Sequence, residues 1–348
     1  MKQSILFFGE LTPNIVHGIS LANSLNIGLL SKEFSIKIIE EKSDLKNHNK
    51  TNISKIKQIF SFANRIYKYN KKDKYNYFYT IFSLSTLGSL KTLILILSYI
   101  LSGKDKIILH IHRGDFEIFY YKNILNKFIS KIIFRMINKL IVLSCNQKNE
   151  FSKYIDSSKI FILENSLLEE YKMIKQNIES SNFIYISNYI KEKGIYELLT
   201  VFKSYNDKYL ECFGSFVNNE EDIRRYDSKN IKVNDFINGK NKFVKLNQAD
   251  ALILPSWNEG QPTIILEAMM MGTIVLTTKV GLIEELLGDD YPFYFKERDK
   301  ISLQNCIKKF ERYKDKEQLS KKLITIYYEK YSKYIHEQKL VKIFKEKN

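Results

Sequence analysis

Short apolar runs alternate along this chain with longer stretches whose apolar positions recur every three or four residues. The first pattern is typical of buried strands and the second of amphipathic helices. Both halves of the chain open with strand, loop, helix and strand, at 4–10, 11–18, 19–32 and 34–41 and again at 182–187, 188–194, 195–206 and 209–214. Because strands joined through helices form parallel sheets, the sequence predicts two doubly wound α/β units.

The remaining patterns extend both units. Apolar runs at 106–112, 139–144 and 161–165 add strands to the first half, the polar segment 168–181 is predicted to be a linker, and 318–347 has a charged helical pattern.

A chain of 348 residues is longer than one ordinary domain. We expect a first domain at 1–165, a second at 166–325, and a C-terminal helix at 326–348 that packs back on the first domain.

The segment 251–272 (ALILPSWNEGQPTIILEAMMMG) concentrates turn residues between an expected strand at 251–255 and another at 273–277. Pro262 stands where the intervening helix would begin and Gly272 just past its last turn, the usual places for these two residues. The segment is therefore predicted to be strand, loop, helix and strand.

Glu267 is the single charged residue on this expected helix. A carboxylate is costly to bury unless it is paired or hydrogen-bonded. Glu259 precedes the helix N-terminus, where free N–H groups attract phosphate or polar oxygens. Two interpretations stay open: the two carboxylates hold a ligand with phosphate and hydroxyl groups, or Glu267 pairs with a lysine or arginine of a neighbouring helix.

Charge is distributed unevenly along the chain. Residues 1–165 hold 25 Lys/Arg and 12 Asp/Glu, a net charge of +13, whereas residues 166–348 hold 30 and 27, a net charge of +3. We therefore expect the first half to face an anionic partner.

Two basic stretches lie in this half. One is the segment 55–74, and the other is a helical pattern with the cations Lys122, Lys127, Lys131, Arg135 and Lys139. Such a helix either lies on an anionic membrane surface or packs on the core with a solvated lysine edge.

The cysteines and the apolar runs bear on localisation. Cys145, Cys212 and Cys306 lack the spacing of a disulfide framework or a metal site, which fits a reducing cytosol. The N-terminal apolar run ends at Glu10, too short for a signal peptide, and the run 92–101 is shorter than the about 20 residues of a membrane span. We expect a cytoplasmic protein, peripherally associated with the inner face of the plasma membrane.

The segment 255–272 resembles the signature of retaining glycosyltransferases of the GT-B fold, glycosyltransferase family 4 (glycosyl transferases group 1): P-S, E-G-x-P, L-E-A and a glycine, with seven residues between the glutamates. Four more segments are similar to family segments in the same order: VHGIS, HIHRGDF followed by KLIVLS, FILENS, and SNYIKEKGIYELL. The resemblance covers most of the chain and implies two Rossmann-like domains facing across a cleft, as in enzymes of bacterial O-antigen and capsule synthesis.

The resemblance also implies roles for individual residues. Glu259 would contact hydroxyls of the donor sugar, Glu267 the ribose hydroxyls, and Lys193 the diphosphate, whose charge it would stabilise as the glycosidic bond breaks. His112 would lie beside the transferred sugar, so His112, Glu259 and Lys193 form the expected catalytic set. The expected donor-binding residues are Gly18, Asn188, Lys193, Glu259, Gly260, Gln261, Pro262, Thr263 and Glu267.

Two points in this assignment stay open. Asn188 stands where the family has arginine, and asparagine brings neither a charge nor a bidentate fork. Either Lys191, Lys193 or another base compensates, or the donor binds weakly. His110 competes with His112, which we favour because it stands at the strand-to-loop junction.

The expected reaction is the retaining, metal-independent transfer of a sugar from a UDP- or GDP-sugar to a hydroxyl of a polyprenyl-diphosphate-linked glycan, in O-antigen, capsule or lipopolysaccharide biosynthesis. No cofactor and no metal are expected. Hydrolysis by two carboxylates fits poorly, because Glu267 is committed to an apolar helix.

Two other functions are compatible with parts of the sequence. Asn188 is compatible with a non-catalytic nucleotide-sugar-binding relative. A pI of about 9.3 is compatible with nucleic-acid binding, but no binding module is recognisable, so no nucleic-acid partner is expected.

Overall fold

The computed structural model describes residues 2–14, 17–41, 53–103, 106–172, 178–216 and 221–346, and the statements below refer to these ranges. The chain forms two compact units: unit 1 comprises Met1–Leu168 and Lys333–Asn348, and unit 2 comprises Glu169–Ser332. The chain thus leaves unit 1 after Leu168 and returns after Ser332, whereas the sequence placed these crossings at 165/166 and 325/326.

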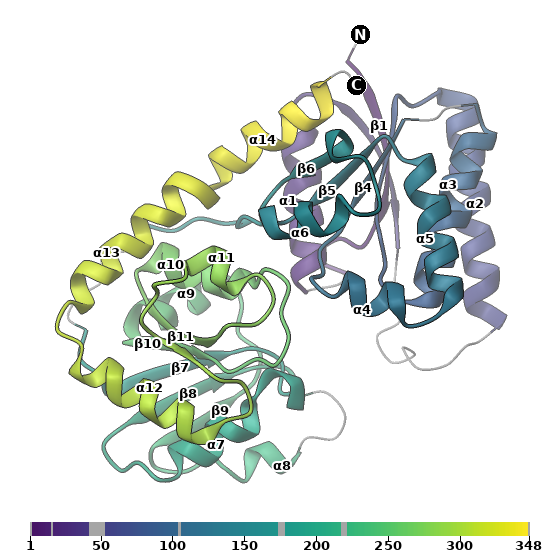
Figure 1. Ribbon diagram of the computed structural model, residues 1–348. Coiled ribbons are helices and arrows are strands. Elements are labelled where there is room, and N and C mark those ends of the chain that lie inside the picture. Colours follow the sequence, from purple (N-terminus) through teal and green to yellow (C-terminus); the bar gives the residue numbers. More distant parts are fainter. Residues whose placement is uncertain are drawn as a thin grey trace. The chain divides into compact units, whose positions relative to one another are not determined.

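Unit 1 is built on a six-stranded parallel sheet with the order β2-β1-β3-β4-β5-β6, of which Figure 1 labels β1, β4, β5 and β6. Its strands are β1 (Ser4–Gly9), β2 (Ser35–Glu40), β3 (Tyr77–Ile81), β4 (Ile107–His110), β5 (Lys139–Val142) and β6 (Ile160–Ile162). The inner strands β1, β3, β4 and β5 read as nearly continuous apolar runs because helices cover both faces of the sheet, whereas the edge strand β2 is exposed or partly exposed at most of its positions.

The helices of unit 1 are α1 (Gly18–Leu30), α2 (Ile53–Asp73), α3 (Thr86–Leu101), α4 (Phe116–Tyr121), α5 (Ile124–Met136), α6 (Cys145–Phe151) and α14 (Lys333–Lys345), with a 3-10 turn η2 (Ser157–Lys159). Successive residues of β1 point to opposite faces. Leu6 and Phe8 join the core under α2, α3 and α5, whereas Ile5 and Phe7 join the core under α1 and α14. The C-terminal helix therefore completes one core of unit 1, to which it contributes Phe344.

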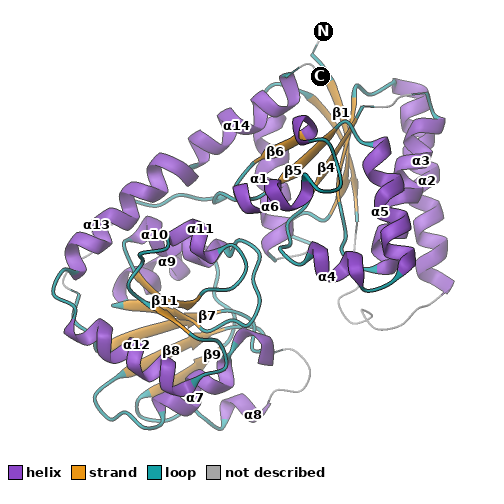
Figure 2. Ribbon diagram, in the orientation of Figure 1, coloured by secondary structure: helices purple, strands orange, loops and turns teal. Residues whose placement is uncertain are grey.

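Unit 2 is also built on six parallel strands, in the order β12-β11-β10-β7-β8-β9, of which Figure 2 labels β11, β7, β8 and β9. They are β7 (Asn182–Ile186), β8 (Tyr209–Phe213), β9 (Ile231–Asn234), β10 (Ala251–Leu254), β11 (Ile274–Thr278) and β12 (Tyr294–Phe295). The order reverses between β7 and β10, since β8 and β9 follow β7 on one side while β11 and β12 follow β10 on the other.

The helices of unit 2 are α7 (Ile195–Phe202), α8 (Glu221–Arg224), α9 (Gly239–Gln248), α10 (Thr263–Met271), α11 (Ile283–Leu287), α12 (Lys300–Arg312) and α13 (Lys316–Ile326), with turns η3 (Lys191–Lys193, 3-10) and η4 (Tyr327–Tyr331, π). Phe183 of β7 packs against Phe202 of α7 and Phe310 of α12, with ring centroids 5.4 and 5.8 Å apart. α9, α10 and α13 pack together on the opposite face (Figure 2).

The expected elements agree with the structure to within a few residues, apart from the tail. The charged helical pattern at 318–347 is divided between two helices: α13 ends in the π turn η4, and Ser332 has the non-helical angles φ −59° and ψ 152°. The C-terminal helix, expected from 326, begins at Lys333. The break at Ser332 lies where the chain passes from unit 2 to unit 1.

Candidate functional site

The segment 251–272 folds as β10, a loop and α10. Pro262 is the N-cap of α10 rather than its first residue, and it has no side-chain acceptor with which to cap the first turn. Gly272 ends the helix in the left-handed conformation at φ 70°, where a side chain would collide with Ser320 Oγ 2.5 Å away. The N-terminus of α10 therefore lacks a capping side chain, as a ligand-binding terminus requires.

Glu259 and Lys193 form an ion pair at the carboxyl ends of β10 and β7. Lys193 Nζ lies 2.7 Å from Glu259 Oε1, and the same oxygen accepts a 2.6 Å hydrogen bond from Ser256 Oγ. The Glu259 side chain is 10% exposed and that of Lys193 is 24% exposed. The structure thus brings together two predicted site residues at the point where the strand order of unit 2 reverses, the usual ligand position in such sheets.

Two glycines allow the loops around this ion pair to approach closely. Gly194 (φ 68°) and Gly281 (φ 61°) are left-handed, and a Cβ atom would lie 2.1 Å from the Pro255 carbonyl oxygen and 1.9 Å from the Glu259 carbonyl oxygen, respectively. Two backbone bonds join the same loops: Trp257 N–H donates to the Glu192 carbonyl at 2.8 Å, and Leu282 N–H donates to the Gly260 carbonyl at 3.0 Å. The loops after β7, β10 and β11 therefore form one packed frame.

Glu267 is buried on α10 and pairs with Lys242 of α9, whose Nζ lies 2.6 Å from Oε1. Burial raises the pKa of Glu267, and the Lys242 ammonium partly offsets this. Of the two interpretations open from the sequence, the structure contains the ion pair with a neighbouring helix. The role of Glu267 toward a ribose stays a prediction.

Five more of the predicted donor-binding residues lie in the loops after β7 and β10 or at the start of α10. Gln261 and Pro262 are buried, Gly260 and Thr263 are partly buried, and Asn188 is exposed. The Asn188 backbone carbonyl accepts a 3.0 Å hydrogen bond from the Tyr185 hydroxyl.

Two further cations lie over the ring of Trp257, a residue of the loop that carries Glu259. The Arg298 guanidinium carbon is 4.2 Å and Lys191 Nζ 5.7 Å from the ring centroid. Arg298 is a non-glycine residue at φ 61°, an unusual conformation. Sequence reasoning missed Ser256, Lys242, Gly281 and Arg298; Arg298 and Gly281 lie outside the family signature, and nothing in their local sequence marks them.

In unit 1, His110 ends β4 and His112 lies two residues beyond it. These two candidates for the residue beside the transferred sugar are in contact, with ring centroids 3.9 Å apart. Burial lowers the pKa of His112 to about 3 despite a raising effect of Asn165, and lowers that of His110 well below its usual range. Both rings are therefore neutral at pH 7.

A buried hydrogen-bond chain links His110 to the C-terminal helix. His110 Nδ1 lies 2.9 Å from the Tyr79 hydroxyl, which lies 3.0 Å from the Asn26 amide nitrogen. His336 Nε2 of α14 lies 2.6 Å from Asn26 Oδ1, and its Nδ1 lies 2.8 Å from the Glu164 carbonyl oxygen. The chain thus connects β4, β3, α1 and α14.

The Glu164 carbonyl only accepts, so His336 Nδ1 carries a proton and donates to it. Burial lowers the pKa of His336 to about 4.

Gly18 is the first residue of α1 and is exposed, with open space where a Cβ atom would lie. His17 caps the helix, since its Nδ1 accepts a 3.3 Å hydrogen bond from Ser20 N–H, and its Nε2 lies 2.8 Å from Glu10. The approach of this turn to a diphosphate stays a prediction, and residues 15–16 of the loop lie outside the described ranges.

One cation of the predicted basic helix face is not on the surface. Lys139 begins β5, is 4% exposed, and donates from Nζ to the carbonyls of Ile343 (2.6 Å) and Glu346 (2.5 Å). Its inclusion in the solvated basic edge was wrong, because α5 ends at Met136 and Lys139 holds the end of α14.

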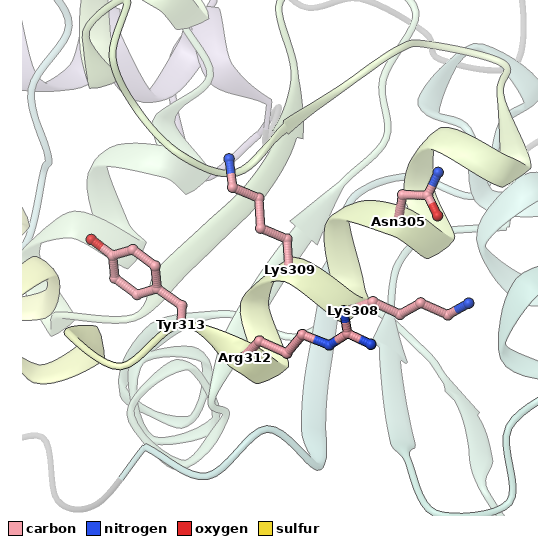
Figure 3. Close-up of a pocket in the computed structure, with 5 residues that line it drawn as sticks. All are labelled: Asn305, Lys308, Lys309, Arg312 and Tyr313. Carbon is pink, nitrogen blue, oxygen red and sulfur yellow. The ribbon is translucent and has the colours of Figure 1, made fainter.

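A hollow of about 420 Å³ runs beside α12 and contains none of the predicted residues. Its five lining residues, Asn305, Lys308, Lys309, Arg312 and Tyr313, fan out from one helix and its C-cap (Figure 3). Their divergent charges form a solvated surface rather than a convergent site.

Comparison with known proteins relates unit 2 to one family. Residues 169–330, nearly all of unit 2, match the family model described as "Glycosyl transferases group 1". TuaC of Bacillus subtilis (strain 168), described as a teichuronic acid biosynthesis glycosyltransferase, is 28% identical over 134 residues. That match covers 37% of this chain and 32% of TuaC, about a third of the length of the relative.

Solved structures share the fold over nearly the whole chain. Sucrose-phosphate synthase (tll1590) from Thermosynechococcus elongatus has a TM-score of 0.77 at 12% identity, covering 99% of this chain and 98% of that one. The lipopolysaccharide outer core galactosyltransferase WaaB has 0.67 at 12% identity, and starch synthase IV from Arabidopsis thaliana 0.65 at 10%, each covering 98% of this chain and 99% of its own. These likenesses confirm the predicted GT-B fold.

Among the described residues, no helix combines the length and the apolar composition needed to cross a bilayer. Within the same ranges, no three His, Cys, Asp or Glu side chains converge as they would around a metal ion.

Proposed function

We propose that this protein is a retaining, metal-independent glycosyltransferase that moves a sugar from a UDP- or GDP-sugar to a hydroxyl of a glycan acceptor. The observation that carries the proposal is the Lys193–Glu259–Ser256 cluster beside the uncapped N-terminus of α10, in a glycosyl transferases group 1 domain. The fold neighbour starch synthase IV holds ADP and acarbose, a nucleotide and a glycan.

The cluster contains the groups that a nucleotide sugar needs. The Lys193 ammonium and the N–H groups at the α10 N-terminus would bind the donor diphosphate. The Glu259 carboxylate would accept hydrogen bonds from the sugar hydroxyls. The bond from the anomeric carbon to the diphosphate oxygen breaks, the acceptor oxygen bonds to the same face of that carbon, and its proton passes to the departing phosphate. Lys193 stabilises the charge that develops on this leaving group.

Two cations are candidates to supply the charge that an arginine at position 188 would bring. Lys191 precedes Lys193 by two residues in the turn η3, and both Lys191 and Arg298 lie over the Trp257 ring. We assign these two cations to the charge of the diphosphate, in place of the fork that Asn188 lacks.

Thermal shift and slow donor hydrolysis, measured over a panel of UDP- and GDP-sugars, test the donor site. We expect one donor to raise the melting temperature, and Glu259→Ala to lower its hydrolysis about a hundredfold, because sugar positioning is lost; chelation of metal should change neither. Glu267→Ala should weaken donor binding, whereas Glu284→Ala, which breaks an exposed pair with Lys279, serves as the control. If neither site variant changes donor binding, the site assignment fails.

The same panel separates the main alternative. Protection by a nucleotide without turnover on any acceptor would identify a non-catalytic nucleotide-sugar-binding relative. Exposed Asn188 is the residue that keeps this alternative open.

The acceptor is proposed to be a polyprenyl-diphosphate-linked glycan at an anionic membrane surface, in surface polysaccharide synthesis. TuaC and WaaB, by their descriptions, act in teichuronic acid and lipopolysaccharide synthesis. Unit 1 exposes apolar side chains where α4 meets α5, and we call this set the α4–α5 corner: Ile118 (75% exposed), Tyr121 (61%), Ile124 (80%), Leu125 (48%) and Phe128 (63%). Lys122, Lys131 and Arg135 are exposed beside it, and apolar tips among cations fit an anionic lipid surface.

Vesicle flotation tests this surface on the full chain, because residues 1–168 alone would lack the core residues of α14. We expect binding to phosphatidylcholine vesicles that contain phosphatidylglycerol, and about tenfold weaker binding after Ile124→Ser with Phe128→Ser. Ile301→Ser, at a 69% exposed residue of unit 2, is the matched control. Equal binding to neutral vesicles would contradict the proposed attraction to anionic lipid. Unchanged binding of the double variant would contradict the placement of the lipid-binding surface at the α4–α5 corner.

A further inference from the structure

Unit 1 contains a cavity at the place where its own strand order reverses. β1 lies between β2 and β3, and the chain runs from β1 to β2 on one side before crossing to β3 on the other. In parallel sheets the crevice at the carboxyl ends of such strands is the usual ligand position. The cavity has a volume of about 80 Å³ and lies at these ends, between residues of β1, α1, β3 and α3.

The walls of this switch-point cavity combine an apolar side with polar groups. Phe8 and Leu95 are among its apolar residues, and its polar side chains include Asn23, Glu41, Ser83 and Lys91. At about 30 Å³ for each water molecule, the cavity admits a hydroxymethyl group or one edge of a sugar ring, while the rest of a ligand would lie outside it.

Asn23 supplies a buried acceptor that has no donor. Its side chain is fully buried, its Nδ2 donates to the Glu10 carbonyl at 2.9 Å, and its Oδ1 has no hydrogen-bond partner. An unsatisfied buried oxygen costs free energy, which a ligand hydroxyl entering the cavity would recover.

Glu41 and Lys91 supply a second pair of contacts. Lys91 Nζ lies 2.6 and 2.7 Å from the two carboxylate oxygens, and the side chains are only 17% (Lys91) and 21% (Glu41) exposed. Lys91 Nζ also lies 5.6 Å from the Phe8 ring centroid. The pair is neutral overall, and it presents both ammonium protons and carboxylate lone pairs.

These groups select the chemistry of the ligand. An anion would meet the carboxylates of Glu10 and Glu41, and a wholly apolar group would leave Asn23 Oδ1 unsatisfied. A sugar hydroxyl both donates and accepts, so it can give its proton to Asn23 Oδ1 or Glu41 while it accepts from Lys91. The apolar wall fits the C–H groups of the same ring.

We propose that the switch-point cavity binds a hydroxyl-bearing edge of a sugar in the acceptor glycan, with Asn23 and Glu41 as acceptors and Lys91 as donor. This inference rests on the proposed function and extends it. It assigns acceptor selection to three residues of unit 1 that lie outside the segments similar to the family. The three side chains come from three different elements or loops, α1, α3 and the residue after β2.

Saturation-transfer NMR with methyl glycosides tests the proposal on the full chain. The probes are methyl hexosides, methyl 6-deoxyhexosides and methyl N-acetylhexosaminides, each titrated with and without UDP and GDP. We expect at least one probe to bind, and its affinity to fall about fivefold to tenfold in Asn23→Leu and in Lys91→Met, the effect of losing one hydrogen bond. Lys153→Met, which breaks the exposed pair with Glu117 in the same unit, should leave it unchanged.

Glu41→Gln keeps the size of the side chain and replaces Asn23→Leu if that variant does not fold. Nucleotide binding, which we place in unit 2, should be the same in every variant, and urea unfolding shows whether unit 1 of each variant is folded. A wild type that binds no methyl glycoside, or binding that survives the substitutions unchanged, overturns the proposal. A wild type that binds a methyl glycoside but no nucleotide would instead overturn the donor site.

Discussion

Gly281→Ala is expected to lower donor turnover by about a hundredfold and to destabilise unit 2. The new Cβ would lie 1.9 Å from the Glu259 carbonyl oxygen, so the loop that carries Glu259 must move. A displacement of about 1 Å at a reacting group costs roughly this factor. The left-handed conformation at φ 61° adds about 1–2 kcal/mol for any residue with a Cβ atom.

Gly239→Ala is the matched control for this prediction. Gly239 has φ 55° and open space at its Cβ position, so alanine there pays the conformational cost without a collision. Urea unfolding and donor hydrolysis of both variants should show a loss of stability in each, but a loss of turnover in Gly281→Ala alone. Equal turnover in the two variants would show that the Gly281 contact does not position Glu259.

Lys242→Met is expected to destabilise unit 2 by about 3–5 kcal/mol, since it leaves the buried Glu267 carboxylate without its ion-pair partner. Glu267→Gln should cost less, and the double variant Lys242→Met with Glu267→Gln should recover much of the loss. Urea unfolding of the three variants measures these differences. A double variant as unstable as Lys242→Met would mean that packing of the lysine stem, rather than charge, is lost.

The same pair predicts a pH dependence. Burial raises the pKa of Glu267 above its unfolded value, and Lys242 works against this rise. The native state therefore binds the proton more tightly, and its stability falls as pH rises from the unfolded pKa through the raised native pKa. Lys242→Met should raise the native pKa of Glu267 further, so the interval between the two pKa values widens and the total loss of stability increases. Glu267→Gln should abolish this contribution. Unfolding curves at several pH values between about 4 and 8 test the direction.

The parts of the fold that follow from local pattern were predictable. Nearly continuous apolar runs identified the buried strands, and the turn residues of 255–272 located α10 to within a residue. The family resemblance placed Lys193 and Glu259 at the same donor, but their ion pair was not predicted.

Contacts between distant segments were not predictable in the same way. Lys242 looks like any lysine of an amphipathic helix, and only the packing of α9 on α10 places it against Glu267. His336 stands in a charged tail, and only the return of the chain to unit 1 brings it to Asn26. For the same reason Lys139 looked like part of a solvated face, although α14 covers it.

Because α14 completes a core of unit 1, the order of synthesis differs from the order of folding. All of residues 169–332 leave the ribosome before the segment that supplies Leu340, Ile343 and Phe344 to that core. Unit 2 can therefore finish folding first, while one face of the older unit keeps apolar surface uncovered. Chaperone contacts with the nascent chain should therefore concentrate on the β1 and α1 face until α14 emerges.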